Sequence, residues 1–589
     1  MLNDAHFTSA TQAADVFARP GGLRRTVALV LPSSDEKRSS AISQAGAEHL
    51  GLGYIAAYLR ARAVEVTVFN FQVDTYVSYW EMAEKAPPVS VDTCARQIIE
   101  SGADIVGMSI TGITIREALG IANRLKELKP EIFIAWGGHQ AFYSAKDLIE
   151  RELSVDAVVA SDGEITMGRL VDCLSLGGSI KEIPGLYVRD GRGRMLYTGP
   201  PPEPELDELP RPARDTLEMM IARGMNITDA RITTSRGCPF KCTFCVDPSL
   251  GYRVKWRARS AELVVAEMKE LVEKYGIKFF WFSEDNFILP TKQGRDRATK
   301  IADLLVEAGL DIGYRALLRA DAINGETELV RKLIRSGLRC VYIGIESGSP
   351  RRLVYLKKHE TPEEYRAVLD QLKATRVGLQ IGFIMFDPFT TWDDLAIDAE
   401  FLRSVGQMYL YSNYCQTLDV FPGTDISLTL IEKGMLSKSF SYDSPYDEYQ
   451  WEDPAIGQLG RAFMRAYGSQ LIELDKHFQR FAVVDVPTIW RASHAGQLDA
   501  GHAERVQAIA DEHLGTLNQA GFDLFTRALE LGRQGWGEAA FHELVQRHYK
   551  AAAAVRVALA HELLGCPAEV RDRMTSMTGI TLANLSEAC

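Results

Sequence analysis

Three cysteines in one short loop are the residues with the clearest capacity for chemistry. Cys238, Cys242 and Cys245 are spaced C-x3-C-x2-C, after an apolar run that ends near Thr234 and predicts a strand. Three thiolates in so short a loop can bind three irons of a 4Fe–4S cluster and leave the fourth iron open, as a catalytic metal centre requires. A zinc site or three unrelated thiols are the alternatives. Zinc usually takes a fourth Cys or His in C-x2-C pairs, and none follows in this stretch.

The cysteine spacing, with Phe244 directly before the last cysteine, resembles the radical S-adenosylmethionine (SAM) superfamily. The resemblance implies that SAM chelates the open iron through its amino and carboxylate groups. It also implies that an electron from the cluster cleaves SAM to a 5′-deoxyadenosyl radical. An external donor such as flavodoxin or ferredoxin would supply that electron, and Phe244 would pack on the adenine of SAM.

Residues 226–425 alternate between strand and helix patterns, which predicts a partial (βα)6 TIM-like barrel with its chemistry at the carboxyl ends of the strands. The first predicted strand leads into the cysteine loop. The other five are predicted at residues 278–282, 311–319, 339–344, 379–385 and 408–420. Helices are predicted between them at 261–275, 295–308, 326–336, 361–374 and 392–405.

Polar residues fall at the ends of these strands. The resemblance places Glu284 and Asp285 at the SAM amino group, and a carboxylate suits an ammonium ion. It places Glu346 at the SAM ribose, and it brings the backbone from Gly382 to Ile384 close to the adenine.

Two residues of the third predicted strand, Tyr314 and Arg319, are candidate catalytic residues because they could point into the barrel. A tyrosine there could exchange a proton with a substrate. A tyrosine that only packs in the core explains the same residue equally well.

Residues 1–195 predict a second α/β unit, a doubly wound, Rossmann-like parallel sheet. Its strands are expected at 26–31, 64–70, 104–111, 132–136 and 157–160, with helices at 50–63 and 113–128. Ligands bind such sheets at the carboxyl ends of the strands, where small residues let a ligand approach the backbone. The small residues at those ends are Ser109, Thr111, Gly112, Gly137, Gly138, Ser161 and Gly163.

A dinucleotide site is not indicated, because no G-x-G-x-x-G follows the first strand. The pattern instead resembles the cobalamin-binding domain that precedes many radical SAM domains. The resemblance rests on residues 51–59, on the Ser/Thr pair after the third strand, on Gly-Gly after the fourth strand and on the segment Asp-Gly-Glu-Ile-Thr at 162–166. The loop at 32–49 lacks the D-x-H-x-x-G motif, so His49 is not expected to ligate cobalt. His139 is expected near the nucleotide tail of cobalamin. A flavodoxin-like scaffold of other purpose is the alternative.

The remaining segments complete the predicted organisation. Residues 196–225 are rich in proline and predict a stiff linker. Residues 426–589 predict helices at 459–467, 470–481, 503–518, 521–532 and 536–564, forming a helical domain that shapes the substrate pocket.

Composition narrows the possible partners and the compartment. The 589 residues carry a net charge of −12, which argues against a nucleic-acid partner. No apolar run approaches the roughly 20 residues that span a bilayer, so no membrane is expected, and the first 20 residues do not resemble a signal peptide. The nine scattered cysteines indicate a reducing cytoplasm.

The combined resemblance implies a cobalamin-dependent radical SAM methyltransferase, similar to the C-methyltransferases of natural-product biosynthesis. Its cofactors would be a 4Fe–4S cluster, SAM and cobalamin, which would carry a methyl group from SAM to a carbon of a small-molecule, amino-acid or peptide substrate. An unactivated C–H bond lacks usable acidity, so a radical must open it. A related variant methylates an aromatic carbon, such as tryptophan C2, without that radical.

Two other classes stay open. One is a cyclase or ring-rearranging enzyme with the same cofactors and no methyl transfer. The other is a SAM-cleaving enzyme, or a non-catalytic scaffold, whose first domain binds no cobalamin.

Overall fold

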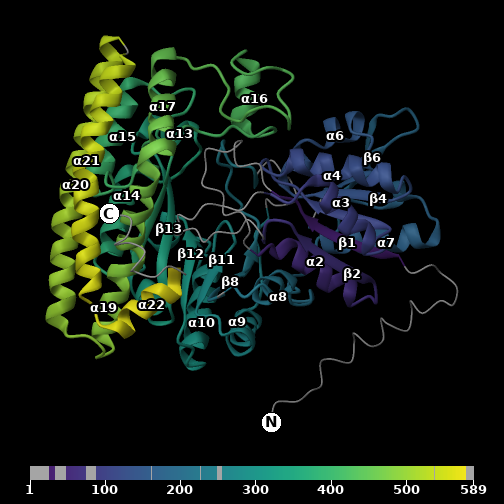
Figure 1. Ribbon diagram of the computed structural model, residues 1–589, viewed down its shortest axis with the longest axis horizontal. Helices are drawn as coiled ribbons and strands as arrows, with labels where there is room; N and C mark the ends of the chain where they lie inside the picture. The colour runs from purple at the N-terminus through teal and green to yellow at the C-terminus, as the bar shows by residue number, and fades with distance from the viewer. Residues whose placement is uncertain are drawn as a thin grey trace.

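The computed structural model describes most of the chain and shows three parts in a row (Figure 1). An N-terminal α/β unit lies at one end, a second sheet with its helices lies in the middle, and long C-terminal helices lie at the other end. The described residues are 25–33, 48–73, 88–160, 162–225, 227–247, 255–535 and 537–578.

The N-terminal sheet has seven strands in the order β2-β1-β3-β4-β5-β6-β7. The first five strands pair in parallel, which confirms the predicted doubly wound sheet, and β6 and β7 extend it antiparallel. The strands are β1 (Thr26–Leu31), β2 (Glu65–Asn70), β3 (Ile105–Ser109), β4 (Phe133–Gly137), β5 (Ala157–Val159), β6 (Leu186–Arg189) and β7 (Met195–Tyr197).

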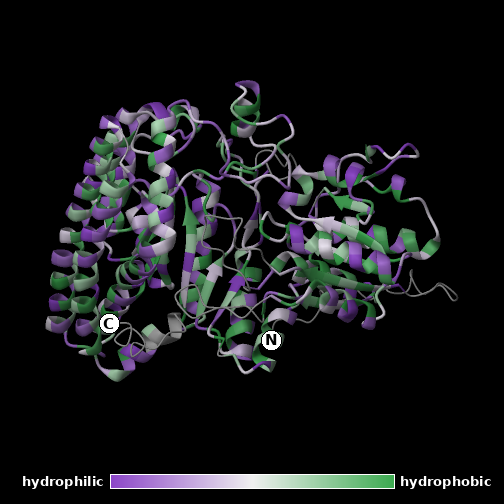
Figure 2. Cartoon of the chain, turned by 45° about the horizontal axis from the view of Figure 1, so that its top comes forward, coloured by the Kyte–Doolittle hydropathy of each residue, from purple (hydrophilic) through white to green (hydrophobic). Residues whose placement is uncertain are grey.

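Helices cover both faces of this sheet, which is why its central strands are continuous apolar runs. Figure 2 shows hydrophobic residues concentrated along these strands. One face packs on α2 (Leu50–Arg60) and α7 (Gly163–Leu176). The other face packs on α3 (Val91–Glu100), α4 (Ile115–Leu128), α5 (His139–Tyr143) and α6 (Ala145–Arg151).

The central sheet has five parallel strands in the order β14-β13-β12-β11-β8. A short antiparallel pair, β9 (Ser235–Arg236) and β10 (Arg257–Ala258), lies beside the cysteine loop. The strands are β8 (Asp229–Ile232), β11 (Phe279–Phe282), β12 (Gly313–Leu318), β13 (Leu338–Glu346) and β14 (Gly378–Phe383). The helices that follow are α9 (Ala261–Tyr275), α10 (Lys292–Glu307), α11 (Ala320–Ile323), α12 (Thr327–Arg335), α13 (Pro350–Tyr355), α14 (Pro362–Lys373) and α15 (Trp392–Ser404).

Local sequence signals fix several of these helix ends. Thr361 and Glu364 form a capping box at the start of α14, where Pro362 occupies the first turn. Gly276 ends α9 with a φ of 69°, a left-handed conformation that glycine adopts without strain.

The predicted sixth barrel strand, residues 408–420, is not a strand. The segment contains a 3-10 turn, η5 (Tyr411–Asn413), and makes one isolated parallel bridge between Phe386 and Thr417. Its aromatic residues do not alternate across a sheet, because Tyr411 and Tyr414 are both buried against the C-terminal helices, where Tyr411 contacts Phe478. The barrel therefore has five strands and a bridge at the sixth position.

The C-terminal region is helical, as predicted, but its divisions differ. Residues 503–518 and 521–532 lie in one helix of 35 residues, α20 (Ala500–Gln534). Gly521 lies inside this helix and does not break it. A Cβ there would meet the backbone carbonyl of Met408, so glycine lets the helix pack closely against that residue. The other helices are α16 (Asp425–Glu432), α17 (Pro454–Ala466), α18 (Ile472–Arg480), α19 (Val486–His494), α21 (Glu538–Leu564) and α22 (Ala568–Thr578), with π-helical turns η6 (Tyr467–Leu471) and η7 (Phe481–Asp485).

These helices cover the β14 edge of the central sheet. A Cβ at Gly378 in β14 would meet the carbonyl of Val483 in η7, so the two backbones are in close contact. The predicted linker contains one helix, α8 (Asp215–Ala222). Across the described ranges, no helix is both long and apolar enough for a membrane span.

A buried arginine joins the ends of β13 and β14. Arg352 is fully buried, pairs with Asp387 and Asp398, and donates to the carbonyls of Ile384 at 2.6 Å and Met385 at 3.2 Å. Asp398 also accepts hydrogen bonds from the loop that follows β13, at Ser347, Gly348 and Ser349. One guanidinium thus fixes both loops together.

We predict that Arg352→Met destabilises the protein by about 3–5 kcal/mol, because two buried carboxylates lose their cation. The neighbouring Arg351, whose side chain is half exposed, is the matched control. Arg351→Met should cost about 1 kcal/mol or less. Urea denaturation followed by circular dichroism compares the two, and equal small losses would show that Arg352 does not anchor these loops.

Candidate active site

The cysteine loop leaves β9 through Gly237, whose φ of 81° allows a turn that other residues rarely adopt. The backbone N–H of Cys245 donates to the carbonyl of Cys242 at 3.1 Å, so the last two cysteines share a tight turn. The loop is anchored at Thr243 by two backbone hydrogen bonds. Its N–H donates to the carbonyl of Leu356, and its carbonyl accepts the N–H of Ile426.

All three thiols are half-buried. Burial raises the pKa of Cys238 to about 11 and raises the pKa values of Cys242 and Cys245 as well. Thiols in this state become thiolates when a metal binds them. Within the described residues, no three His, Cys, Asp or Glu side chains converge on a single ion position. A cubane cluster needs no such convergence, because each thiolate binds its own iron.

Two buried cations lie beside the loop. The guanidinium of Arg319 stacks on Phe240 of the loop, 3.5 Å from the ring centroid, and pairs with Glu360 at 2.6 Å. Lys358 lies 3.5 Å from Glu346 and donates to the carbonyl of Gly344. Both cations counter the rise in the pKa of Cys242. The structure therefore brings the predicted Arg319 to the cluster loop, together with a lysine that the sequence did not single out.

Tyr314 does not point into the barrel, and the predicted catalytic role does not fit its position. Its hydroxyl lies 2.9 Å from Ser336 and donates to the carbonyl of Leu333 at the end of α12, while its ring stacks on Phe282. Successive residues of a strand face opposite sides, so the interior position belongs to Arg315. The structure favours a packing role for Tyr314.

Arg315 is an interior residue that the sequence patterns did not single out. Its guanidinium donates to Gln380 of β14 at 2.8 Å and lies over the rings of Trp281 and Tyr342. The four side chains fill the barrel interior from four neighbouring strands. The alternation of side chains along β12 predicts that Tyr314 and Arg315 face opposite sides of the sheet. It does not show which of these two sides is the barrel interior.

Glu284 and Asp285 have different environments at the end of β11. Glu284 is buried, and its carboxylate accepts hydrogen bonds from the hydroxyl of Thr234 at 2.6 Å and from the Thr234 N–H at 3.2 Å. Burial raises its pKa. Asp285 is exposed, and its charge contributes to the raised pKa values of Cys238 and Cys245. Asp285 therefore lies on the cysteine side, while Glu284 holds the strand that leads into the loop.

Glu346 has an uncommon backbone conformation for a residue with a side chain, with a φ of 71°. Burial raises its pKa, and Lys358 opposes that shift. Non-glycine residues in this region cost about 1–3 kcal/mol and cluster at functional sites. The carbonyl of Glu346 accepts the N–H of Ile384 at 2.9 Å, which ties β13 to the chain just after β14.

The other predicted SAM residues lie around the same end of the barrel. A Cβ at Gly382 would meet the hydroxyl of Tyr342 at 2.6 Å, so only glycine fits there. Phe244 is partly buried against the barrel core. The structure thus places Phe244, Asp285, Glu346, Gly382 and Ile384 at the carboxyl ends of the strands.

A cavity of about 730 Å³ lies between the N-terminal sheet and the central sheet. The central part of the chain contributes Arg231, Thr233, Ser235, Arg236, Ser283 and Glu284 to its walls. The predicted residues that line it are Ser109, Thr111, Gly112, Gly137, Gly138, His139 and Gly163. Ser161 lies outside the described residues.

The inner end of this cavity is an apolar slot between the strands and the helices α2 and α7. Leu29, Ala135, Val159 and Met167 are among its lining residues. Open space adjoins Gly137, because a Cβ there would have only one neighbour within 4 Å, the Cβ of Val159 at 3.9 Å. Apolar lining residues at one end and polar strand ends at the other suit cobalamin, which has a flat aromatic base at the end of its nucleotide tail.

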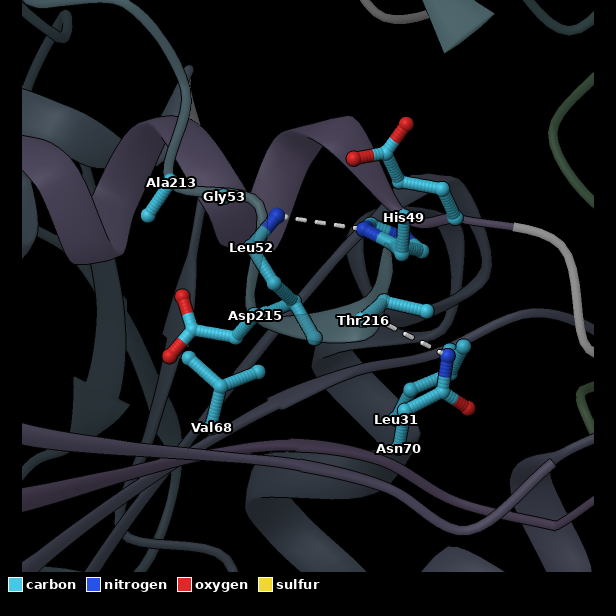
Figure 3. Close-up of a pocket in the computed structure, with 10 residues that line it drawn as sticks. Leu31, His49, Leu52, Gly53, Val68, Asn70, Ala213, Asp215 and Thr216 are labelled. Atoms are coloured by element: carbon cyan, nitrogen blue, oxygen red, sulfur yellow. Dashed lines mark hydrogen bonds between the residues drawn. The ribbon is translucent and has the colours of Figure 1, made fainter. Parts of the chain in front are cut away.

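His49 faces this cavity with both ring nitrogens engaged. Its Nδ1 accepts the N–H of Leu52 at the start of α2 (Figure 3), and its Nε2 lies 2.8 Å from the hydroxyl of Ser109. Because Nδ1 accepts, the neutral ring carries its proton on Nε2 and donates it to Ser109. Burial lowers the pKa of His49 to about 4, which keeps the ring neutral.

A segment after the barrel closes another wall of the cavity. Phe421 and Tyr446 line it, their rings are 5.0 Å apart, and the Tyr446 hydroxyl donates to Gln140 of α5. A Cβ at Gly112 would overlap Tyr446, so these two residues are in close contact. Among the described residues that line this cavity, none belongs to the helices from α17 to α22.

Comparisons with known proteins agree with this architecture. The family model "B12 binding domain" matches residues 44–171, and the model "Radical SAM superfamily" matches residues 232–402. The solved structure of the cobalamin-dependent SAM radical enzyme OxsB, with aqua-cobalamin and SAM bound, superimposes with a TM-score of 0.67 at 17% identity and covers 96% of this chain and 84% of that chain. The radical SAM methyltransferase TsrM from Kitasatospora setae gives a TM-score of 0.54 at 18% identity, covering 90% of this chain and all of that chain.

Curated relatives extend the similarity. Uncharacterized methyltransferase PH0819 of Pyrococcus horikoshii is 30% identical over 64% of this chain and 78% of its own length. Hopanoid C-3 methylase of Methylococcus capsulatus is 26% identical over 59% of this chain and 62% of its own length. Anaerobic magnesium-protoporphyrin IX monomethyl ester cyclase of Rubrivivax gelatinosus is 25% identical over 57% of this chain and 58% of its own length. The chain thus spans less than two thirds of the last two relatives.

The fold, the cysteine loop, the cavity and these matches lead to one assignment. The chain belongs to the radical SAM superfamily, among the members that also carry a cobalamin-binding domain, and it is an enzyme whose cofactors are a 4Fe–4S cluster, SAM and cobalamin.

Proposed function

We propose that this enzyme transfers a methyl group from SAM, by way of cobalamin, to a carbon atom of a natural-product precursor. The observation that carries the proposal is that the cobalamin cavity and the cysteine loop share one wall. Arg236, two residues before Cys238, and Glu284, which holds Thr234, both line the cavity. Relatives that are named as a methyltransferase and a methylase support the same reaction.

When bound, the cluster supplies the electron that cleaves SAM, and cobalamin carries the methyl group. The chain's own residues bind and orient these groups. We propose that Asp285 receives the SAM amino group, that Glu346 receives the ribose hydroxyls, and that Phe244 packs on the adenine. Gly382 and Ile384 would offer backbone to the adenine, and the hydrogen bond from Arg352 would hold the Ile384 carbonyl in place.

The walls of the cavity suit radical chemistry, which must exclude water. The slot is apolar, and Phe421 and Tyr446 shield the side next to α5. We propose that these two aromatic residues contact the substrate, which would be a small molecule, an amino acid such as tryptophan, or a peptide. An external donor such as flavodoxin or ferredoxin and a reducing, cytoplasmic setting belong to the same proposal.

A cyclase or ring-rearranging enzyme with the same cofactors is the second candidate. The similarity to the magnesium-protoporphyrin IX monomethyl ester cyclase favours it, at 25% identity. The two candidates use the same cofactor sites and differ in the fate of the SAM methyl group.

Trideuteromethyl-SAM separates these two reactions. Incubated anaerobically with reductant and with tryptophan, small peptides or other candidate precursors, the enzyme should give a product three mass units heavier than the product from unlabelled SAM, because three hydrogens become deuterium. Mass spectrometry with fragmentation places the label on carbon. SAM consumption with a modified but unlabelled product would contradict methyl transfer and support the cyclase.

The cysteine loop has its own test. Cys238→Ala, Cys242→Ala or Cys245→Ala should each lose most of the iron, from about four per chain, and all turnover. Cobalt should stay near one per chain, because these substitutions do not change the residues that line the cobalamin cavity. Cys173→Ala, which removes a thiol of α7 outside the loop, is the control and should keep both metals. Full turnover in a loop variant would rule the proposed mechanism out.

The tethered state of His49 predicts that cobalamin binds without a histidine ligand below cobalt. The electron paramagnetic resonance (EPR) spectrum of bound Co(II) should lack nitrogen splitting from the protein, and His49→Gln should leave it unchanged. His139→Gln, at another wall of the cavity, is the control. Splitting that disappears in His49→Gln alone would show that the histidine ligates cobalt.

A further inference from the structure

The cysteine loop is held at both ends by the N-terminal domain. Before the loop, Arg236 donates to Glu164 at 2.7 Å and lies 3.2 Å from the carboxylate of Asp162. After the loop, the carbonyl of Val246 accepts a hydrogen bond from the hydroxyl of Tyr143. Val246 directly follows Cys245, so the three cysteines lie between two contacts with the same domain.

The residues that hold the loop belong to the walls of the cobalamin cavity. Asp162 and Glu164 flank Gly163 at the start of α7, and all three line the cavity. Tyr143 is the last residue of α5, a helix of five residues that begins at His139, which also lines the cavity. The segments that follow β4 and β5 therefore line the cobalamin cavity on one side and contact the cysteine loop on the other.

Burial makes the Arg236 contact hard to break. The side chains of Arg236 and Glu164 are 13% and 2% exposed. The guanidinium also lies over the ring of Tyr54 in α2, 4.7 Å from its centroid. Removing one member of such a pair leaves a buried charge without a partner. The start of the cysteine loop therefore moves only if the start of α7 moves with it.

Asp162 extends the same contact to the neighbouring strand. It pairs with Arg257 of β10 at 2.7 Å, and Arg257 is the strand partner of Arg236 in the β9–β10 pair. One carboxylate thus holds both strands at the base of the loop. Other ion pairs of this domain, such as Arg62 with Asp172, lie within it and do not reach the loop.

We infer that Arg236 and Tyr143 are positioning residues that couple cobalamin binding to the cluster and its SAM site. Cobalamin and SAM each favour the arrangement in which the shared loops are docked, so each ligand strengthens the binding of the other. Thermodynamic linkage requires the two effects to be equal. The inference rests on the cofactor set of the enzyme and not on methyl transfer.

The test measures SAM affinity in the full-length protein with its cluster reconstituted, with and without hydroxocobalamin. Equilibrium dialysis of labelled SAM under anaerobic conditions gives the two dissociation constants. We expect cobalamin to tighten SAM binding about five-fold or more, within the usual range of coupling between sites. The EPR signal of the reduced cluster should also shift when cobalamin binds.

Arg236→Gln and Tyr143→Phe should each reduce the coupling to less than about two-fold, below the roughly five-fold at which the usual range of coupling begins. Tyr143→Phe removes one hydroxyl and keeps the ring, so it remains informative where Arg236→Gln fails to fold. Arg236→Lys keeps the charge and should restore part of the coupling. The matched control is Arg151→Gln, which breaks a half-exposed ion pair between α6 and Asp443 and leaves the loop untouched.

The outcomes separate this inference from the proposed function. A wild-type enzyme that binds both ligands with no coupling overturns the inference alone. Full coupling in both Arg236→Gln and Tyr143→Phe overturns the role of these two residues. A wild-type protein that binds no cobalamin overturns the inference and the proposed function together. If Arg151→Gln lost the coupling to the same extent, the coupling would reflect general docking of the domains. That result would also contradict the inference.

Discussion

The burial of several arginine–carboxylate contacts between the two α/β domains is the constraint on which the rest of this structure depends. Arg214 of the connecting segment pairs with Glu48 of the N-terminal domain and with Glu267 of α9, and all three side chains are at most 8% exposed. Arg259 of the central domain pairs with Glu267 and donates to the hydroxyl of Tyr54. A buried ion that loses its partner is strongly destabilising, so these groups hold the domains in one relative position. That position creates the cavity.

The docking also determines what the active site can do. Neither domain alone encloses the space, because the N-terminal sheet supplies a slot for a flat ligand and the central sheet supplies the opposite wall with the cysteine loop. In the proposed reaction, a methyl carrier and a radical generator must be close to act on one substrate atom, and catalysis depends on such orientation. The aromatic residues Phe421 and Tyr446 add a third wall to this space. Because this segment lines the cavity, we propose that substrate selection depends on it at least as much as on the distant helices.

The cysteine loop, the parallel sheets and the strand-end residues could be predicted from sequence, because each rests on local spacing or on the period of apolar residues. Other features depend on contacts between distant residues. Residues 408–420 have a strand-like composition but pack their tyrosines into the C-terminal helices. Tyr314 and Arg319 lie on one predicted strand, yet the packing of Tyr314 against α12, a contact with a distant segment, decides that its side chain faces away from the barrel interior. The contact between Arg236 and Glu164 joins residues 72 positions apart, with no local signal in either segment.

If one shared site holds both metal cofactors near each other, their unpaired electrons must interact through space. EPR spectroscopy of the enzyme with Co(II) cobalamin and a reduced cluster measures this interaction directly. We expect spectra that are broadened or split relative to the sum of the spectra of samples holding one paramagnetic centre each. Spectra that equal that sum, in a sample with both centres present at full occupancy, would contradict a shared site.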